Sequence, residues 1–206
     1  MSASPELVPD TRRRILDAAA EAFMASGFGN ATIDDIARDV GATKGLVYYH
    51  FRSKFDIFLA VYAEAMGRVR KQVEPHVDGH GTGRDRLVAM SVAHVFNLMT
   101  DLAYHHVVHQ GVRGEASMAL KPRQRDALGA LNKLRKDYEQ MFHRVVEAGI
   151  ADGSLRRVHA SLATRTLLSN LNAVDMWYHR IEGQPVEEKH DLARQIVDLL
   201  IGGLGA

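Results

Sequence analysis

The chain has 206 residues, 46% of them apolar, which allows one long or two short domains with a substantial core. It contains no cysteine, which excludes a disulfide framework and thiolate catalysis. The net charge is only +1, so the position of the charges must carry any argument for nucleic-acid binding. No run of about 18 apolar residues occurs, and residues 1–9 hold no apolar signal stretch. We therefore expect a cytoplasmic protein without a membrane span.

The first predicted helix follows the short polar tail. Asp10 or Thr11 is expected to cap it. Its apolar residues recur at helical spacing, and Gly27 is expected to end it. The buried stripe should consist of Ile15, Leu16, Ala19, Ala20 and Phe23.

The stretch from Thr32 to Phe51 predicts two short helices joined by a tight turn. Thr32 is a natural N-cap, and Asp35 stands three positions later, as in a capping box. Gly41 should end this helix in the left-handed conformation, and Thr43 should open the next one. Two short helices around a glycine-containing turn form a helix-turn-helix.

These segments resemble the DNA-binding domain of the TetR (tetracycline-repressor-like, AcrR-type) family of bacterial regulators. The resemblance covers residues 11–62 and rests on three pieces: ILDAAAEAFMASG (15–27), TIDDIARDVG (32–41) and KGLVYYHFRSK (44–54). It implies an all-α homodimer with a three-helix DNA-binding domain at residues 9–69. A larger helical domain for ligand binding and dimerisation would occupy residues 70–206. It also implies that a bound ligand changes the spacing of the two recognition helices and releases the operator.

The charge pattern agrees with a DNA-reading helix. No Asp or Glu lies between Val40 and Phe55, while basic residues and tyrosines alternate there. We expect the start of the second helix to face bases and its flanks to hold phosphates. The base-facing residues would be Thr43, Lys44, Gly45 and Leu46, and the phosphate contacts Thr32, Tyr48, Tyr49, His50 and Lys54. The alternative is an ordinary exposed helix in a bundle.

The rest of the chain predicts helices only. A long helix should begin near Lys54, and later ones should cover about 84–102, 105–114, 122–149, 160–180 and 185–202. The last two are apolar over a wide arc, which predicts a homodimer formed through them. Such a dimer places two recognition helices about 34–36 Å apart, so we expect a near-palindromic double-stranded operator.

Polar residues set among apolar ones could orient a small molecule in a mostly apolar cavity. We predict as its lining Met90, His94, Asn97, Met141, Asn170, Asp175 and Trp177; core packing is the alternative for each. The segments GIADGSLR and MWYHRIEGQPV resemble a TetR branch that includes regulators of fatty-acid and steroid catabolism, several of which answer to acyl-CoA thioesters. No basic cluster for the phosphates of CoA is evident in this half of the sequence.

Other chemistry has weaker support. His105 and His109 share a helix face and could hold a metal, but HEXXH is absent and no carboxylate completes the set locally. No nucleophile elbow accompanies Ser91 or Ser169, so we expect neither an enzyme nor a cofactor. The sequence therefore favours a repressor released by a small hydrophobic effector. The alternative is a helical binding or metal-binding protein whose helix-turn-helix does not read DNA.

Overall fold

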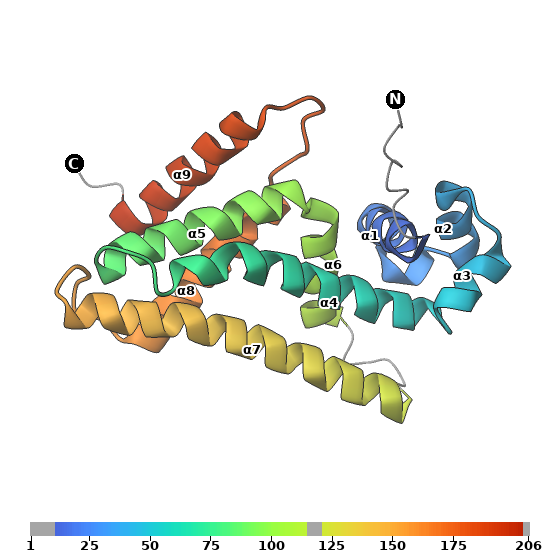
Figure 1. Cartoon of the computed structure of the whole chain (residues 1–206), viewed down its shortest axis with the longest axis horizontal. Helices are drawn as coiled ribbons and strands as arrows, with labels where there is room; N and C mark the ends of the chain where they lie inside the picture. Colours follow the sequence, from blue (N-terminus) through green and yellow to red (C-terminus); the bar gives the residue numbers. More distant parts are fainter. Residues whose placement is uncertain (1–10, 115–120, 204–206) are drawn as a thin grey trace, which may run out of the picture.

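The computed structural model of the protein describes residues 11–114 and 121–203. Over these residues the chain forms helices joined by turns, without a β-strand, which confirms the all-α prediction. The first three helices gather at one end of an elongated molecule, and the others extend away from them (Figure 1). These three are α1 (Thr11–Asn30), α2 (Ile33–Val40) and α3 (Lys44–His50).

The turn chemistry of the helix-turn-helix follows the sequence prediction. The hydroxyl of Thr32 accepts from the backbone N–H of Asp35 at 3.1 Å, and the Asp35 carboxylate accepts from the Thr32 N–H at 3.3 Å. Gly41 ends α2 at φ 68°, in the left-handed region where glycine is unstrained. The side chain of Thr43 caps α3 by accepting from the N–H of Leu46 at 3.2 Å. Sequence-local hydrogen bonds thus set the angle at which α3 leaves α2.

Helix α1 is kinked where the sequence predicted its end. Gly27 has φ 75° and ψ 157°, and a last short turn carries the helix on to Asn30. The predicted buried stripe of α1 is confirmed, because all five of its apolar residues are at most 2% exposed. Of the two candidate caps, Asp10 lies outside the described residues.

The remaining helices form the long part of the molecule. Helix α4 runs unbroken from this end into the rest of the fold (Figure 1). It contacts α1 and, farther along, α5, α6 and α7. The predicted division between residues 69 and 70 falls inside α4. The elements are α4 (Lys54–Val73), η1 (Glu74–His76), α5 (Gly83–Thr100), α6 (Leu102–Gly114), α7 (Pro122–Ala151), α8 (Ala160–Asn172), η3 (Ala173–Met176) and α9 (Val186–Gly202).

Two glycines bring the start of α5 against the end of α7. A Cβ on Gly83 would lie 2.2 Å from the backbone nitrogen of Gly149, so the two backbones touch. The turn after α7 then caps α5: Asp152 accepts from the Gly83 N–H at 2.7 Å and Ser154 from the Arg84 N–H at 3.0 Å. The GIADGSLR segment therefore ends α7 and also caps the start of α5.

The predicted helix over 160–180 is wrong at its end. Helix α8 stops at Asn172, a 3₁₀ turn follows, and the chain leaves it at Trp177. Around this end, Asn172 lies 3.2 Å from His94 of α5, and the Tyr178 hydroxyl donates to Gln184 at 2.8 Å. Such contacts have no signature in the helical periodicity.

Among the described residues, no single helix is both long and apolar enough to cross a membrane; only the α5–α6 pair, bent by 100°, passes by length and composition.

Candidate DNA-binding surface and effector cavity

Helix α3 presents its start and its outer face to solvent. Val47 is fully buried and anchors the helix in the core, whereas Tyr49 is 83% exposed and Tyr48 is 47% exposed. Thr43, Lys44 and Gly45 are exposed as well, and Leu46 is partly so. The base-facing residues that we predicted therefore share one open surface. His50 is half-buried, with its ring against those of Tyr49 and Phe51.

Lys44 is held by an acidic residue that the sequence reading did not pair with it. Its Nζ lies 2.9 Å from Oδ2 of Asp34 on α2. Asp34 raises the pKa of Lys44 through this hydrogen bond and through its charge. Both side chains are at least half exposed, so the pair is open to exchange with another anion.

Lys54, a predicted phosphate contact, also binds the chain itself. Its Nζ donates to the carbonyl oxygens of Gly29 and Ala31, at 3.0 and 2.7 Å, and lies 4.7 Å from the centre of the Phe28 ring. These contacts tie the start of α4 to the end of α1. An ammonium has three N–H donors, so the phosphate contact of Lys54 stays a prediction beside this structural role.

The second candidate site is a cavity of about 700 Å³ inside the larger helical part. This volume falls in the range of small-molecule sites. Its apolar walls come from α4, α6, α8 and η3 and include Met66, Val108 and Leu168. Its polar lining comprises His94, His105, His109, Arg135, Tyr138, Glu139, Arg165, Ser169, Asn172 and Asp175.

His94 is fixed as a neutral imidazole. Nδ1 lies 2.8 Å from the Tyr138 hydroxyl and Nε2 lies 3.2 Å from Oδ1 of Asn172. An amide oxygen can only accept, so Nε2 carries the hydrogen and Nδ1 accepts from Tyr138. Burial lowers the pKa of His94 to about 4. Burial, together with His94 and His109, also lowers the pKa of His105.

The carboxylate of Asp175 on η3 enters the same cavity. It accepts a short hydrogen bond from Nδ1 of His109 and lies 3.9 Å from Nδ1 of His106. His105 binds Asn97 instead of sharing a ligand with His109. Across the described ranges, no cluster of three or more His, Cys, Asp or Glu is arranged to hold a metal.

The predicted cavity residues divide into three groups. His94 and Asp175 line the cavity. Met90, Asn97 and Met141 are buried but do not belong to its walls. Asn170 and Trp177 are exposed and line no part of it, so the structure places them outside this cavity. Trp177 was expected inside on the assumption that the helix continues past Asn172, whereas Asn170 lies within α8 on its exposed face.

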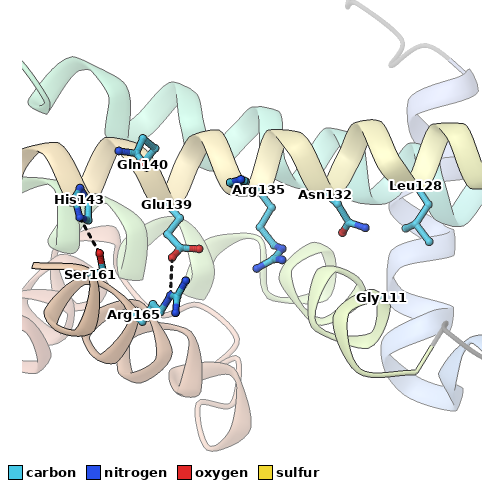
Figure 2. A pocket seen from close by; sticks show the side chains of 10 residues that line it. Gly111, Leu128, Asn132, Arg135, Glu139, Gln140, His143, Ser161 and Arg165 are labelled. Carbon is cyan, nitrogen blue, oxygen red and sulfur yellow. Dashed lines mark hydrogen bonds and ion pairs between the residues drawn. The ribbon is translucent and has the colours of Figure 1, made fainter.

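A basic groove, which the sequence reading missed, adjoins the cavity. Side chains of α7 and α8 face each other across it, with the α6 residue Gly111 at its far side (Figure 2). The groove shares Arg135, Glu139 and Arg165 with the cavity and adds Lys136 and His143. Arg135 and Arg165 are about 30 residues apart in sequence, so no basic run announces them. Glu139 pairs with Arg165 at 3.4 Å between the two spaces.

Large apolar side chains remain exposed along α8, η3 and α9. They include Leu162 at 65%, Trp177 at 52% and Leu199 at 55% exposure. The short stretch 173–180 contributes to three regions of the molecule. Trp177 belongs to the exposed apolar surface, Asp175 lines the cavity, and Arg180 pairs with Glu21 of α1 at 2.9 Å.

These features define a helix-turn-helix regulator with a second, cavity-containing helical part. The chain matches the family model of bacterial regulatory proteins of the tetR family over residues 15–61, and that of the tetracyclin repressor-like C-terminal domain over residues 80–204. The chain belongs to the TetR family of transcriptional regulators. Members of this family are DNA-binding repressors, and some respond to small molecules.

Individual relatives extend over nearly the whole chain. It is 22% identical to the fatty acid metabolism regulator protein of Bacillus subtilis, over 93% of this chain and 94% of that protein. It is 26% identical to the transcriptional repressor KstR2 of Rhodococcus jostii, over 95% and 91% respectively. The crystal structure of AibR with isovaleryl coenzyme A and operator DNA has a TM-score of 0.74 at 18% identity, over 93% of this chain and 98% of that one. The curated relatives are named as regulators, not as enzymes.

Proposed function

We propose that this chain is a homodimeric repressor that binds a near-palindromic operator in the cytoplasm and releases it when a small molecule occupies the cavity. The exposed start of α3 carries this proposal. Thr43 to Leu46 are open to solvent in one helical turn, and Lys44 offers a flexible cation that can donate to guanine acceptors. Tyr48 and Tyr49 flank them as candidate phosphate contacts.

The exposed apolar face of α8 and α9 supports the homodimer. Contiguous apolar surface on a soluble chain is typical of an interface, and a two-fold pair would cover it with the same residues from each protomer. Leu162→Glu with Leu199→Glu should convert a dimer into monomers in analytical ultracentrifugation. Arg194→Glu, an exposed control on α9, should leave the dimer intact.

The cavity supports an effector whose buried part is uncharged. His94 and His105 are buried and neutral, so an ionised group beside them would be poorly solvated. A carbonyl or hydroxyl group could hydrogen-bond in this part of the cavity. Charged parts of the effector would lie in the part lined by Arg135 and Arg165, which the cavity shares with the groove.

An acyl-CoA fits this division of polarity and is our specific candidate. The acyl chain would occupy the cavity and the phosphates the basic groove, where Lys136 joins the two arginines. The groove supplies basic side chains for the phosphates of CoA, which were not evident as a cluster in the sequence. The isovaleryl coenzyme A in the AibR structure is a further reason to test this class.

The decisive experiment is selection of bound fragments from genomic DNA with the purified protein, followed by release with candidate compounds, acyl-CoAs among them. One enriched near-palindrome that a single compound class releases would support the whole proposal. No enrichment at moderate salt would favour a binding module that does not read DNA. Lys136→Gln and Arg165→Gln should weaken acyl-CoA binding, while Lys71→Gln, on the exposed face of α4, should not.

A further inference from the structure

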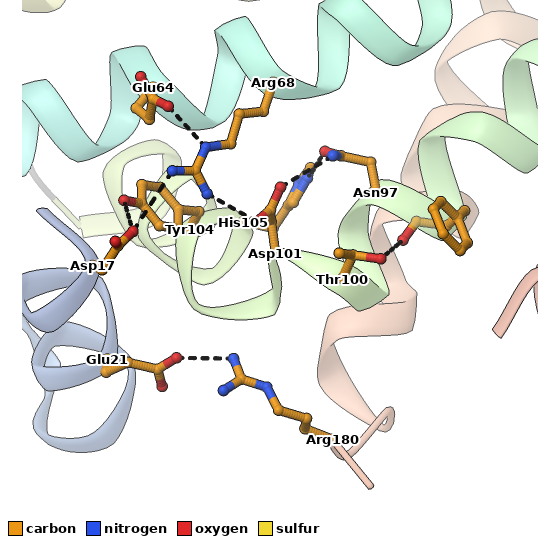
Figure 3. A network of polar contacts seen from close by, with 11 residues as sticks. Asp17, Glu21, Glu64, Arg68, Asn97, Thr100, Asp101, Tyr104, His105 and Arg180 are labelled. Atoms are coloured by element: carbon orange, nitrogen blue, oxygen red, sulfur yellow. Dashed lines mark hydrogen bonds and ion pairs between the residues drawn. The ribbon is translucent and has the colours of Figure 1, made fainter. Parts of the chain in front are cut away.

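Arg68 of α4 stands at the junction of the two parts of the molecule. Its guanidinium is mostly buried and faces three carboxylates, one from α1, one from α4 itself and one from the corner between α5 and α6 (Figure 3). Nε donates to Glu64 at 2.8 Å and Nη1 donates to Asp101 at 2.9 Å. Its third corner, Nη2, faces Asp17 of α1 at 3.6 Å and is buried without a hydrogen-bond partner.

Asp17 is held instead by α6. The Tyr104 hydroxyl donates to Asp17 at 2.6 Å, and the Arg68 guanidinium lies over the Tyr104 ring at 4.0 Å. Arg68 therefore holds the corner between α5 and α6 firmly and holds α1 only loosely. A small shift of the guanidinium would exchange these roles, since a full Arg–carboxylate bond needs about 2.7–2.9 Å.

A second set of hydrogen bonds joins Asp101 to the cavity. Nδ2 of Asn97 donates to Asp101 at 3.2 Å, and Oδ1 of Asn97 accepts from Nε2 of His105 at 2.9 Å. Both Asn97 and His105 are only 4% exposed, and His105 lines the cavity. The orientation of the Asn97 amide is thus fixed from both ends, with no water needed to complete it.

We infer that His105, Asn97, Asp101 and Arg68 form a relay through which cavity occupancy sets the hold on Asp17, and hence the position of α1 and the recognition helix. When His105 is displaced, the Asn97 amide oxygen loses its donor, the amide is free to turn, and its hold on Asp101 weakens. Arg68 then turns from Asp101 to Asp17. Arg68 and Asn97 are positioning residues in this scheme; neither touches DNA.

This inference rests on the proposed function, and coupling between two sites is reciprocal. Operator binding at α3 must therefore be felt at His105 without any effector. The probe is an operator duplex selected from random DNA, added to protein labelled with ¹⁵N-histidine. The His105 imidazole signals are assigned by their loss in His105→Gln, and His50 serves as the reporter of DNA contact.

The expected result is a shift of the His105 signals on operator addition in the wild-type protein. Asn97→Leu and Arg68→Lys should abolish this shift, because leucine offers no amide and an ammonium cannot hold two carboxylates as a guanidinium fork does. Arg68→Lys should also change the operator Kd by about fivefold or more. Arg70→Gln is the matched control: Arg70 lies on the same helix, pairs with Glu74 on the surface, and its replacement should preserve the shift.

If operator addition shifts the His50 signals of the wild-type protein but not the His105 signals, the inference is wrong and the proposed function still stands. Persistence of the shift in Asn97→Leu and Arg68→Lys would overturn it too. If no duplex is enriched, the proposed function fails, and Asp17→Asn then decides the inference. Loss of that carboxylate must move the His105 signals if the relay exists, and an unmoved spectrum would refute it.

Discussion

Lys44 and Asp34 form an ion pair at 2.9 Å across the helix-turn-helix, so the recognition helix carries its own counter-ion when DNA is absent. If Lys44 binds a guanine or phosphate as proposed, it must exchange some or all of its contact with Asp34 for the new acceptor. We expect this exchange to disfavour DNA that offers Lys44 only a weak acceptor. Asp34 would then contribute to discrimination between operator and random sequence without touching either.

The first prediction concerns this pair. Lys44→Ala should weaken operator binding by roughly 10- to 100-fold and relax preference at one operator position. Asp34→Asn should strengthen binding to random duplex more than binding to operator, because Lys44 is then free for any phosphate. Fluorescence anisotropy with operator and shuffled duplexes measures both. Equal losses on the two duplexes for Lys44→Ala would show that Lys44 holds only the backbone.

Gly45 allows a test of whether glycine is needed at this position for stability or for operator binding. A Cβ there would meet only Thr43 Oγ1, at an ordinary 3.8 Å, so the fold does not require glycine. Gly45→Ala should leave the protein as stable or stabilise it, since alanine is favoured in helices by about 0.5–1 kcal/mol. Operator affinity should nevertheless fall about tenfold, or ~1.4 kcal/mol, if the α3 backbone approaches the bases closely. Unchanged affinity would place Gly45 outside the interface.

Lys54→Met should destabilise the fold. It removes the charged donor that serves the Gly29 and Ala31 carbonyls, at a cost of about 1–3 kcal/mol in the free energy of unfolding. Arg52→Met, an exposed neighbour, is the control and should unfold like the wild type. Urea denaturation followed by circular dichroism at fixed protein concentration compares them. Equal stability of the two variants would show that the hydrogen bonds of Lys54 to Gly29 and Ala31 do not stabilise the fold.

The neutral His94 makes stability depend on pH. Its pKa of about 4 in the folded chain lies below the usual 6.5, so the unfolded chain binds more protons between these values. The stabilisation is complete above about pH 6.5 and is lost as the pH falls toward 4, up to about 3 kcal/mol for this group. His105 acts in the same direction. His94→Gln should flatten the rise in unfolding free energy between pH 5 and pH 7; an unchanged slope would exclude His94 as its source.

The close contact of α5 and α7 permits a matched glycine test. Gly83→Ala would drive a methyl group into the Gly149 backbone, which no side-chain movement can relieve, so we expect a loss of about 3 kcal/mol or more. Gly129→Ala, on the exposed face of α7 with nothing near its Cβ, should be neutral or slightly stabilising. Thermal melts of both variants measure the difference.

The sequence was most informative where the determinants are local. Thr32, Gly41 and Thr43 act within four residues of their own helices, so their roles could be predicted from spacing alone. The buried stripe of α1 was predictable for the same reason. Tertiary contacts were not visible in this way. Asn172, at the end of α8, meets His94, which lies 78 residues earlier.

The candidate sites show the same division. The open start of α3 was predicted, but the tie of Lys54 to Gly29 and Ala31 was not, because an exposed lysine and a buried donor look alike in sequence. The cavity depended on which way α8 and η3 turn, so Asn170 and Trp177 were misplaced. The basic groove exists only because α7 and α8 lie side by side.

Residues 173–180 take part in several sites at once, and this matters for the design of a small-molecule biosensor from this protein. A substitution there changes the recognition chemistry of Asp175, the exposed apolar surface and the Arg180 tie to α1 together, so altered selectivity would be confounded with altered response. Leu168 and Met66 contact the cavity without belonging to that segment. Variation confined to such wall positions could give receptors of new selectivity whose output remains comparable from one variant to the next.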